Sequence, residues 1–234
     1  MDTATGVVFD GDDTLWLTEP LYDEARSEAA SAVADAGLSA EDWERRERVI
    51  DVRNVATMGF STARFPASCV QAYEELCRES GRSANASVAA RIREAAHSVF
   101  ARDPPPAPGA RDTLGAFRER GYKLALLTKG DPQIQAHRIE QSGLRDLFHV
   151  VDVVREKSPA GIRRLVSSMG VDAPNAWMVG NSLRSDILPA LEAGLKAVWL
   201  RTHVWEYERA HDHLADERVR SISELSELRA MIAP

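Results

Sequence analysis

The sequence is poor in cysteine, and the two that it has are not spaced for a covalent or metal-binding role. Cys69 and Cys77 are the only cysteines among 234 residues. On a single helix, their spacing would separate them by roughly 12 Å along the axis, which is too far for a disulfide. Neither has a second thiol or a histidine at zinc-ligand spacing, so we expect two small buried apolar residues.

Long apolar runs and basic clusters are also missing, and each absence excludes a class of protein. No run of 18 apolar residues occurs, and the first residues lack the basic and apolar segments of a signal peptide. We therefore expect a cytoplasmic protein with no membrane partner. The formal net charge is −7, and no block of Lys or Arg offers a surface for a phosphate backbone, so we expect no nucleic-acid partner. Monomer and homodimer are both compatible with the sequence.

The first half of the chain has a helical period. Within residues 20–102, apolar positions recur at every fourth residue, as in Leu21, Ala25, Ala29 and Val33. This spacing predicts amphipathic helices, about four in this region. Four prolines then fall within residues 102–111, where they forbid a helix and predict an extended connector at a domain boundary.

Beyond the connector, short apolar runs alternate with amphipathic stretches. Runs of this kind are typical of parallel strands covered by helices on both faces. The N-terminal run Gly6–Phe9 has the same character and is expected to join this sheet. The sequence thus predicts a doubly wound, Rossmann-like α/β core over residues 1–16 and 108–234, with a helical insertion over 17–107. The expected strands after the insertion are 123–128, 148–154, 176–180 and 197–201, and the expected helices are near 110–120, 132–142, 159–169 and 186–193.

The stretch FDGDDTLW, residues 9–16, gathers three carboxylates directly after the first expected strand. Ligands of open parallel sheets bind at the carboxyl ends of the strands, so the side chains delivered there are candidates for a site. The other strands deliver a hydroxyl, ammonium groups, an amide and a further carboxylate. The candidates are Asp10, Asp12, Asp13, Thr128, Lys129, Gly130, Lys157, Gly180, Asn181, Ser182 and Asp186.

These side chains match the needs of phosphoryl transfer. Asp10 and Asp12 are two residues apart on an extended chain and point to the same side, which suits a nucleophile and a proton shuttle. Bound Mg²⁺ would keep Asp10 ionised. Thr128 and the N–H groups of the Lys129–Gly130 turn can donate to phosphoryl oxygens, and Lys157 adds a balancing positive charge.

Four segments together resemble the haloacid dehalogenase-like (HAD) hydrolase superfamily, in its type with a helical C1 cap. They are VVFDGDDTLW for the DxDxT motif, LALLTKGD for the second-motif Thr, REKSP for the third-motif Lys, and WMVGNSLRSDILPALEAG for the metal motif. The resemblance implies a Mg²⁺-dependent phosphatase acting on a small phosphorylated metabolite through an aspartyl-phosphate. It implies that Asp10 is the nucleophile and that Asp12 is the acid and base. Thr128 and Lys157 would hold the phosphoryl group.

The metal motif departs from the family pattern at one position. The resemblance implies that Mg²⁺ is held by the Asp10 side chain, the Asp12 main-chain carbonyl, and the fourth-motif residues Asn181 and Asp186. The family most often has Asp where this chain has Asn181, and an amide oxygen brings no charge. Asp186 is therefore expected to carry more of the neutralisation, directly or through water.

Other activities of the same fold remain open. Haloacid dehalogenases of the family lack the acid two positions after the nucleophile, so Asp12 favours a phosphatase, while a phosphomutase depends on how the cap closes. A phospho-switch module or a non-catalytic scaffold is a further alternative, against which the set Asp10, Asp12, Thr128 and Lys157 argues.

Four residues are candidates for reading the substrate. Trp16 follows the acidic cluster and either contacts substrate or packs inside the protein. The others lie in or beside a break in the helical period near Gly59, and loops held on a scaffold often carry specificity. These are Arg53, Phe60 and Arg64.

Overall fold

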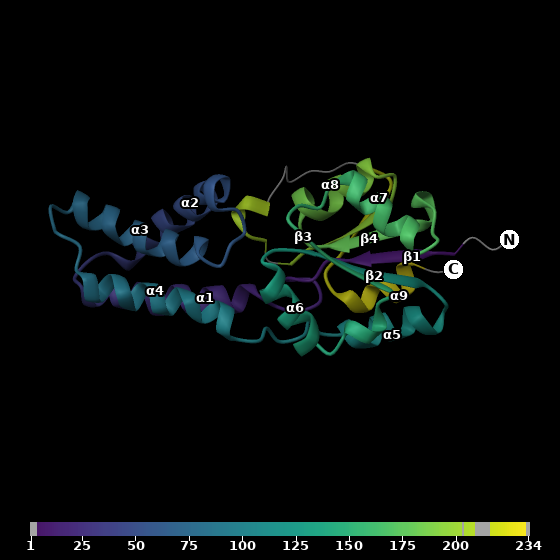
Figure 1. Cartoon of the computed structure of the whole chain (residues 1–234), viewed down its shortest axis with the longest axis horizontal. Helices are drawn as coiled ribbons and strands as arrows, with labels where there is room; N and C mark the ends of the chain where they lie inside the picture. Colours follow the sequence, from purple (N-terminus) through teal and green to yellow (C-terminus); the bar gives the residue numbers. More distant parts are fainter. Residues whose placement is uncertain (1–3, 203, 209–215, 233–234) are drawn as a thin grey trace. The chain divides into compact units, whose positions relative to one another are not determined.

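The computed structural model describes residues 4–202, 204–208 and 216–232 (Figure 1). The chain forms two compact units. Residues 1–18 and 104–234 make up the first, which we call the sheet unit, and residues 19–103 make up the second, which we call the helical unit. Each unit buries an apolar cluster of its own. None of the helices in the described ranges combines the length and hydropathy of a membrane span.

The sheet unit contains one six-stranded sheet in which every strand pair is parallel. The strand order is β3-β2-β1-β4-β5-β6, which is that of a Rossmann-like fold, so the predicted fold class is confirmed. In the register, Gly6 of β1 lies opposite Lys123 of β2 and Ala176 of β4. The strands are β1 Gly6–Phe9, β2 Lys123–Lys129, β3 Val150–Val154, β4 Ala176–Gly180, β5 Lys196–Leu200 and β6 Val219–Ile222.

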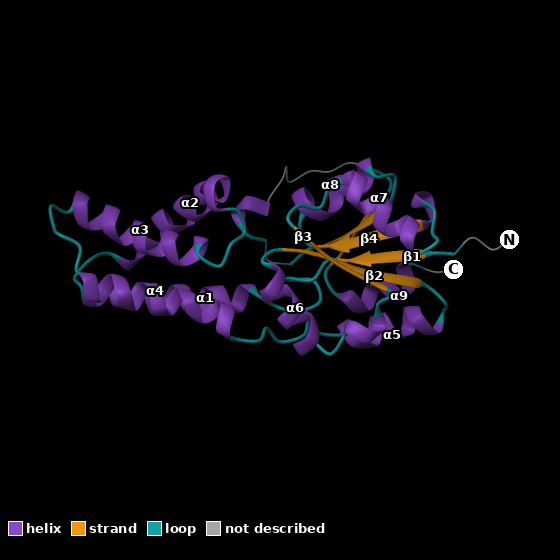
Figure 2. Cartoon of the chain, viewed as in Figure 1, coloured by secondary structure: helices purple, strands orange, loops and turns teal. Residues whose placement is uncertain are grey.

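Helices cover both faces of this sheet (Figure 2). Val7 and Phe9 of β1 belong to the apolar cluster that includes Phe117 of α5, whereas Val8 belongs to the cluster that includes Ile162 of α7. This alternation explains why the strands read as continuous apolar runs. The helices are α5 Ala110–Glu119, α6 Pro132–Gln141, α7 Pro159–Ser168, α8 Leu188–Glu192 and α9 Leu228–Met231. Shorter turns are the 3₁₀ segments Arg145–Leu147, Ala173–Asn175, Glu206–Glu208 and Leu225–Glu227 and the π-helical segment Leu183–Ile187.

The helical unit consists of α1 Glu19–Asp35, α2 Ala40–Met58, α3 Arg64–Glu79 and α4 Ala86–Ala101. The serine and asparagine before α2 and α4 cap them, since Ser39 Oγ accepts from Asp42 N at 3.1 Å and Asn85 Oδ1 accepts from Ser87 N at 2.8 Å. Gly59, with a φ of 59°, ends α2. Both cysteines are buried on α3 with free thiols.

Two segments of the sheet unit connect it to the helical unit, and they run side by side. Leu17 N donates to Pro105 O at 2.8 Å, and Ala107 N donates to Leu15 O at 2.9 Å. Trp16 and Pro106 form an antiparallel bridge between these bonds. The segments 15–17 and 105–107 are therefore a short hydrogen-bonded pair, which we call the paired connectors.

Candidate active site

The candidate site lies at the carboxyl end of β1. This strand sits between β2 and β4, where the strand order of the sheet reverses. In open α/β sheets such a switch point leaves a crevice outside the strand ends in which ligands bind. Asp10 follows β1, Thr128 is the penultimate residue of β2, and Asn181 follows β4.

Three charged residues from separate segments of the chain meet there. Lys157 Nζ donates to Asp10 Oδ1 and, at 2.7 Å, to Asp186 Oδ1. All three side chains are buried, with side-chain exposures of 9% for Asp10 and 1% for both Lys157 and Asp186. Thr14 Oγ1 also donates to Asp10 Oδ2 at 3.1 Å. The structure thus brings together three residues that the sequence predicted from different strand ends.

The charges of this cluster do not balance. Burial and the nearby Asp186 carboxylate raise the pKa of Asp10 to about 7, against the opposing effect of Lys157. Burial alone would lower the pKa of Lys157, but the Asp10 and Asp186 carboxylates outweigh it and raise that pKa above its ordinary value. When both carboxylates are ionised, the single ammonium of Lys157 leaves a net negative charge in a buried place.

Thr128 offers a hydrogen-bond donor beside this cluster. Its side chain is 1% exposed, and its Oγ1 has no hydrogen-bond partner among the described residues. A Cβ on Gly11 would lie 3.1 Å from that Oγ1 and 2.5 Å from the Trp16 ring, so only glycine fits there. A buried hydroxyl without a partner is rare in proteins and suits a ligand oxygen.

Lys129 lies in a second polar cluster. Its Nζ donates to Ser185 Oγ at 2.6 Å and to the carboxylate of Glu208. Glu208 also accepts from Ser182 Oγ at 2.6 Å and from Ser185 Oγ at 2.5 Å. Burial would raise the pKa of Glu208, but Lys129 and the two hydroxyls outweigh it and hold that pKa below its usual range. Gly130, which follows Lys129, has a φ of 144° that only glycine adopts freely. Phosphate binding by Lys129 and Gly130 stays a prediction.

The predicted metal ligands supply oxygen atoms of several kinds. Asn181 is 8% exposed, and its main-chain carbonyl accepts from Trp199 Nε1 at 3.0 Å. Asp186 Oδ2 accepts from Ser182 N at 3.0 Å. Among the described residues, no three His, Cys, Asp or Glu side chains group as a metal site. Any cation here would therefore depend on the two carboxylates of Asp10 and Asp186 with amide and carbonyl oxygens.

Asp12 has partners that the sequence analysis missed. Its carboxylate accepts hydrogen bonds from Trp16 and from two residues of α6, Gln135 and Arg138. A signal for the α6 pair existed, because two polar residues three positions apart fall on the buried face of an amphipathic helix. Glu208 gave no such signal, since it lies in a three-residue 3₁₀ turn far along the chain.

The other candidates for substrate reading lie in the helical unit. Arg64 is 7% exposed, and its Nη1 pairs with the Asp51 carboxylate. Arg53 is exposed, with its Nη2 3.6 Å from Glu75 Oε1, and Phe60 is half-buried after the end of α2. Their reading of a substrate, like that of Trp16, stays a prediction.

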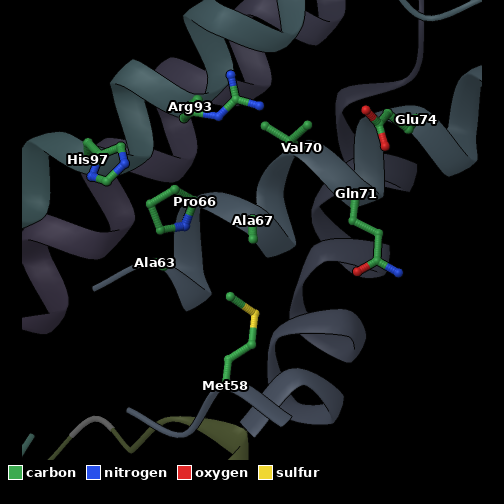
Figure 3. A pocket seen from close by; sticks show the side chains of 9 residues that line it. All are labelled: Met58, Ala63, Pro66, Ala67, Val70, Gln71, Glu74, Arg93 and His97. Carbon is green, nitrogen blue, oxygen red and sulfur yellow. The ribbon is translucent and has the colours of Figure 1, made fainter. Parts of the chain in front are cut away.

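A pocket of about 440 Å³ is also present within the helical unit (Figure 3). Met58, Pro66 and Val70 contribute its apolar lining, and Arg93 and His97 of α4 border it. None of the predicted site residues lines this pocket.

Comparison with known proteins identifies the family. The sequence model of the haloacid dehalogenase-like hydrolases matches residues 4–194. The chain belongs to this family. A solved haloacid dehalogenase-like hydrolase from Xanthomonas campestris is 28% identical and superposes with a TM-score of 0.79 over 98% of this chain and 95% of its own.

The name glyceraldehyde 3-phosphate phosphatase recurs among the curated relatives of this haloacid dehalogenase-like hydrolase. The protein from Methanopyrus kandleri is 28% identical over 200 residues, which cover 83% of each chain. The protein from Pyrococcus abyssi is 37% identical over 99 residues, which cover 40% of this chain and 42% of the relative.

Proposed function

We propose that this chain is a phosphatase that hydrolyses a small phosphate monoester through an aspartyl-phosphate. One observation carries the proposal: the buried Asp10 carboxylate meets Lys157 at the carboxyl end of β1, with Asp12 two residues on. The names of the curated relatives, which include phosphoserine and phosphoglycolate phosphatases, support a phosphate ester as the substrate.

The residues would act in two steps. Asp10 Oδ attacks phosphorus, and the bond to the leaving oxygen breaks while Asp12 gives that oxygen a proton. Water then attacks the phosphorus of the aspartyl-phosphate and gives a proton back to Asp12, so phosphate leaves and Asp10 is restored. Lys157 and the unpartnered Thr128 hydroxyl would hold the phosphoryl oxygens, because the protein mainly positions groups and neutralises charge in this chemistry.

The charge imbalance at the site fits a divalent cation with oxygen ligands. Asp10, the main-chain carbonyl of Asp12, Asn181 and Asp186 would hold Mg²⁺, a hard ion that prefers such donors. The ion would supply positive charge next to the phosphoryl oxygens and would favour the ionised form of Asp10.

The presence of Asp12 distinguishes a phosphatase from a haloacid dehalogenase of the same fold. A haloacid dehalogenase needs no acid at this position, whereas a phosphate monoester needs a proton on its leaving oxygen. The carboxylate of Asp12 is ordered by four hydrogen bonds, as a proton-transfer group should be. A phosphomutase uses the same residues and would be recognised by transfer of phosphate to a second alcohol.

The test is phosphate release from a panel of phosphorylated metabolites, with and without Mg²⁺. The wild-type protein should release phosphate from at least one class of monoester, and Asp10→Asn should abolish release while leaving the circular dichroism spectrum unchanged. Full activity in Asp10→Asn would overturn the mechanism. Halide release from haloacids alone would favour the dehalogenase, and stable labelling by acetyl phosphate without turnover would favour a phospho-switch.

A further inference from the structure

The side chain of Asp12 is held at both of its carboxylate oxygens. Trp16 Nε1 donates to Oδ1 at 2.6 Å, and Gln135 Nε2 donates to Oδ2 at 2.8 Å. Arg138 Nη1 lies 3.1 Å from each oxygen. These contacts come from three side chains and reach both oxygens, so the direction of the carboxylate is restrained from both sides.

Two of these donors come from α6, which is fixed close to the strand ends. Gln135 and Arg138 are three residues apart on one face of that helix, with exposures of 2% and 5%. Asp131 caps the helix by accepting from Gln133 N at 2.9 Å. Gln135 Nε2 also donates to the carbonyl of Lys129 at 3.1 Å, which ties it to the end of β2.

The loop that carries Asp12 does not need α6 to hold its backbone. Leu15 N donates to Gly11 O at 2.8 Å, which closes the turn. Asp13 accepts from both the main-chain N and the Oγ1 of Thr18, at 2.8 and 2.7 Å. Because the backbone is already fixed by these bonds, the contacts from α6 act on the side chain of Asp12.

We propose that Gln135 and Arg138 are positioning residues that direct the Asp12 carboxylate for proton transfer. The inference rests on the proposed function, in which Asp12 protonates the leaving oxygen and later takes a proton from water. A free Asp side chain samples several rotamers, and a shift of about 1 Å in a reacting group can cost as much as 100-fold in rate. Fixing the side chain beforehand avoids that loss.

A double-mutant cycle between Asp12 and Arg138 distinguishes a positioning role of Arg138 from a structural one. Turnover of p-nitrophenyl phosphate and phenyl phosphate is measured for the wild type, Arg138→Met, Asp12→Asn and the double variant. Arg138→Met should lower kcat by about tenfold or more and change KM little when Asp12 is present. In the Asp12→Asn background the same change should lower kcat by less than about twofold, since the group to be positioned is gone.

Conservative and neutral variants complete the test. Arg138→Lys should restore part of kcat, because an ammonium can still donate to one oxygen. Gln135→Leu repeats the cycle without removing a buried charge, in case Arg138→Met folds poorly. Gln133→Leu and Arg164→Met, on exposed positions of α6 and α7, are the matched controls and should leave kcat unchanged.

The outcomes separate this inference from the proposed function. Phosphate release by the wild type that is lost in Asp10→Asn supports the function whatever the α6 variants do. Equal loss of kcat from Arg138→Met in both backgrounds would assign α6 a structural role and overturn the inference. A kcat that stays unchanged or rises in both Arg138→Met and Gln135→Leu would also overturn it. A wild type that releases no phosphate from either probe or from any metabolite of the panel overturns both.

Discussion

Three neighbouring carboxylates of the loop after β1 have three different surroundings. Asp10 is buried against Lys157, and Asp12 is partly exposed and held from α6. Asp13 has a φ of 58° and accepts two hydrogen bonds from Thr18, which makes it the residue that shapes the turn. Identical side chains can therefore take different tasks, because each has its own partners.

Asn181 offers a test of the metal site at the scale of a single residue. We expect Asn181→Asp to tighten Mg²⁺ binding by roughly tenfold, because it adds a charge at the carboxyl end of β4 without removing an oxygen donor. Calorimetric titration with Mg²⁺ measures the affinity, and the Mg²⁺ dependence of phosphate release gives a second reading.

Asn175→Asp is the matched control for this prediction. Asn175 precedes β4 and Asn181 follows it, so the two asparagines lie at opposite ends of the same strand. The control should leave Mg²⁺ affinity unchanged. An affinity that also stays unchanged in Asn181→Asp would count against Asn181 as a ligand.

The sequence predicted the site residues that follow strands, but it did not predict which residues of other segments form hydrogen bonds to Asp12 and Lys129. Asp10, Lys157 and Asp186 were predictable as neighbours, because parallel strands deliver their carboxyl ends to one edge. Periodicity could mark Gln135 and Arg138 as polar residues on the buried face of a helix. Their pairing with Asp12, and that of Glu208 with Lys129, depends on how separate segments pack, which periodicity does not encode.

At the scale of elements, β6 shows why one strand escaped prediction. It lies at the edge of the sheet and pairs only with β5 among the described strands. Its central residues, Arg220 and Ser221, are exposed, while Ile222 is buried. Polar residues protect an edge strand from pairing with other chains, and they also remove the apolar run by which the inner strands were recognised.

Helices α1 and α2 share a buried ionic contact. Glu47 is fully buried, and its Oε2 accepts from Arg26 Nε at 3.2 Å while its Oε1 has no partner among the described residues. Burial, together with the nearby Asp51 and against the pull of Arg26, raises the pKa of Glu47 from 4.5 to about 7. Arg26 does not neutralise Glu47 alone, because its Nη1 also donates to Glu19 Oε1 at 3.0 Å.

This contact predicts a pH-dependent stability. Between pH 4.5 and about 7 the folded protein binds more protons at Glu47 than the unfolded chain does, so its contribution to the free energy of unfolding falls as pH rises. Glu47→Gln stays neutral and should escape this loss. Urea denaturation at pH 5 and pH 8 should therefore show the variant gaining stability relative to wild type at the higher pH.

The exposed Glu28 of α1 provides the control. Glu28→Gln makes the same chemical change at a solvated position, and its stability difference from wild type should be nearly the same at both pH values. If the stability difference between Glu47→Gln and wild type is also the same at both pH values, Glu47 is ionised in the folded protein.

At the scale of the whole molecule, the two units have separate cores. The sheet unit buries its strands between helices, and the helical unit buries residues such as Trp43 and Phe65 among its own four helices. Strand β1 is nevertheless separated from the rest of its sheet by the entire helical unit along the chain. The alternation of elements after the prolines, together with the first apolar run, made this arrangement predictable in outline.

The sheet unit should survive removal of the helical unit. Replacing residues 19–103 by a short Gly-Ser linker should leave a protein with the circular dichroism of a parallel α/β fold and cooperative urea unfolding, because loop closure between adjacent ends costs little. A deletion that also removes residues 15–17 and 105–107 is the comparison and should not fold. A linker variant that unfolds without cooperativity would contradict the prediction.

The paired connectors have a consequence for how such a protein can diversify. Leu17 and Pro105 are hydrogen-bonded neighbours where the chain passes between the two units, so the inserted sequence begins and ends at nearly one point. Inserts of very different length can be accommodated at such a point without shifting the register of β1 against β2 and β4. The strands and the loops at their carboxyl ends can thus be inherited unchanged while the insert is exchanged.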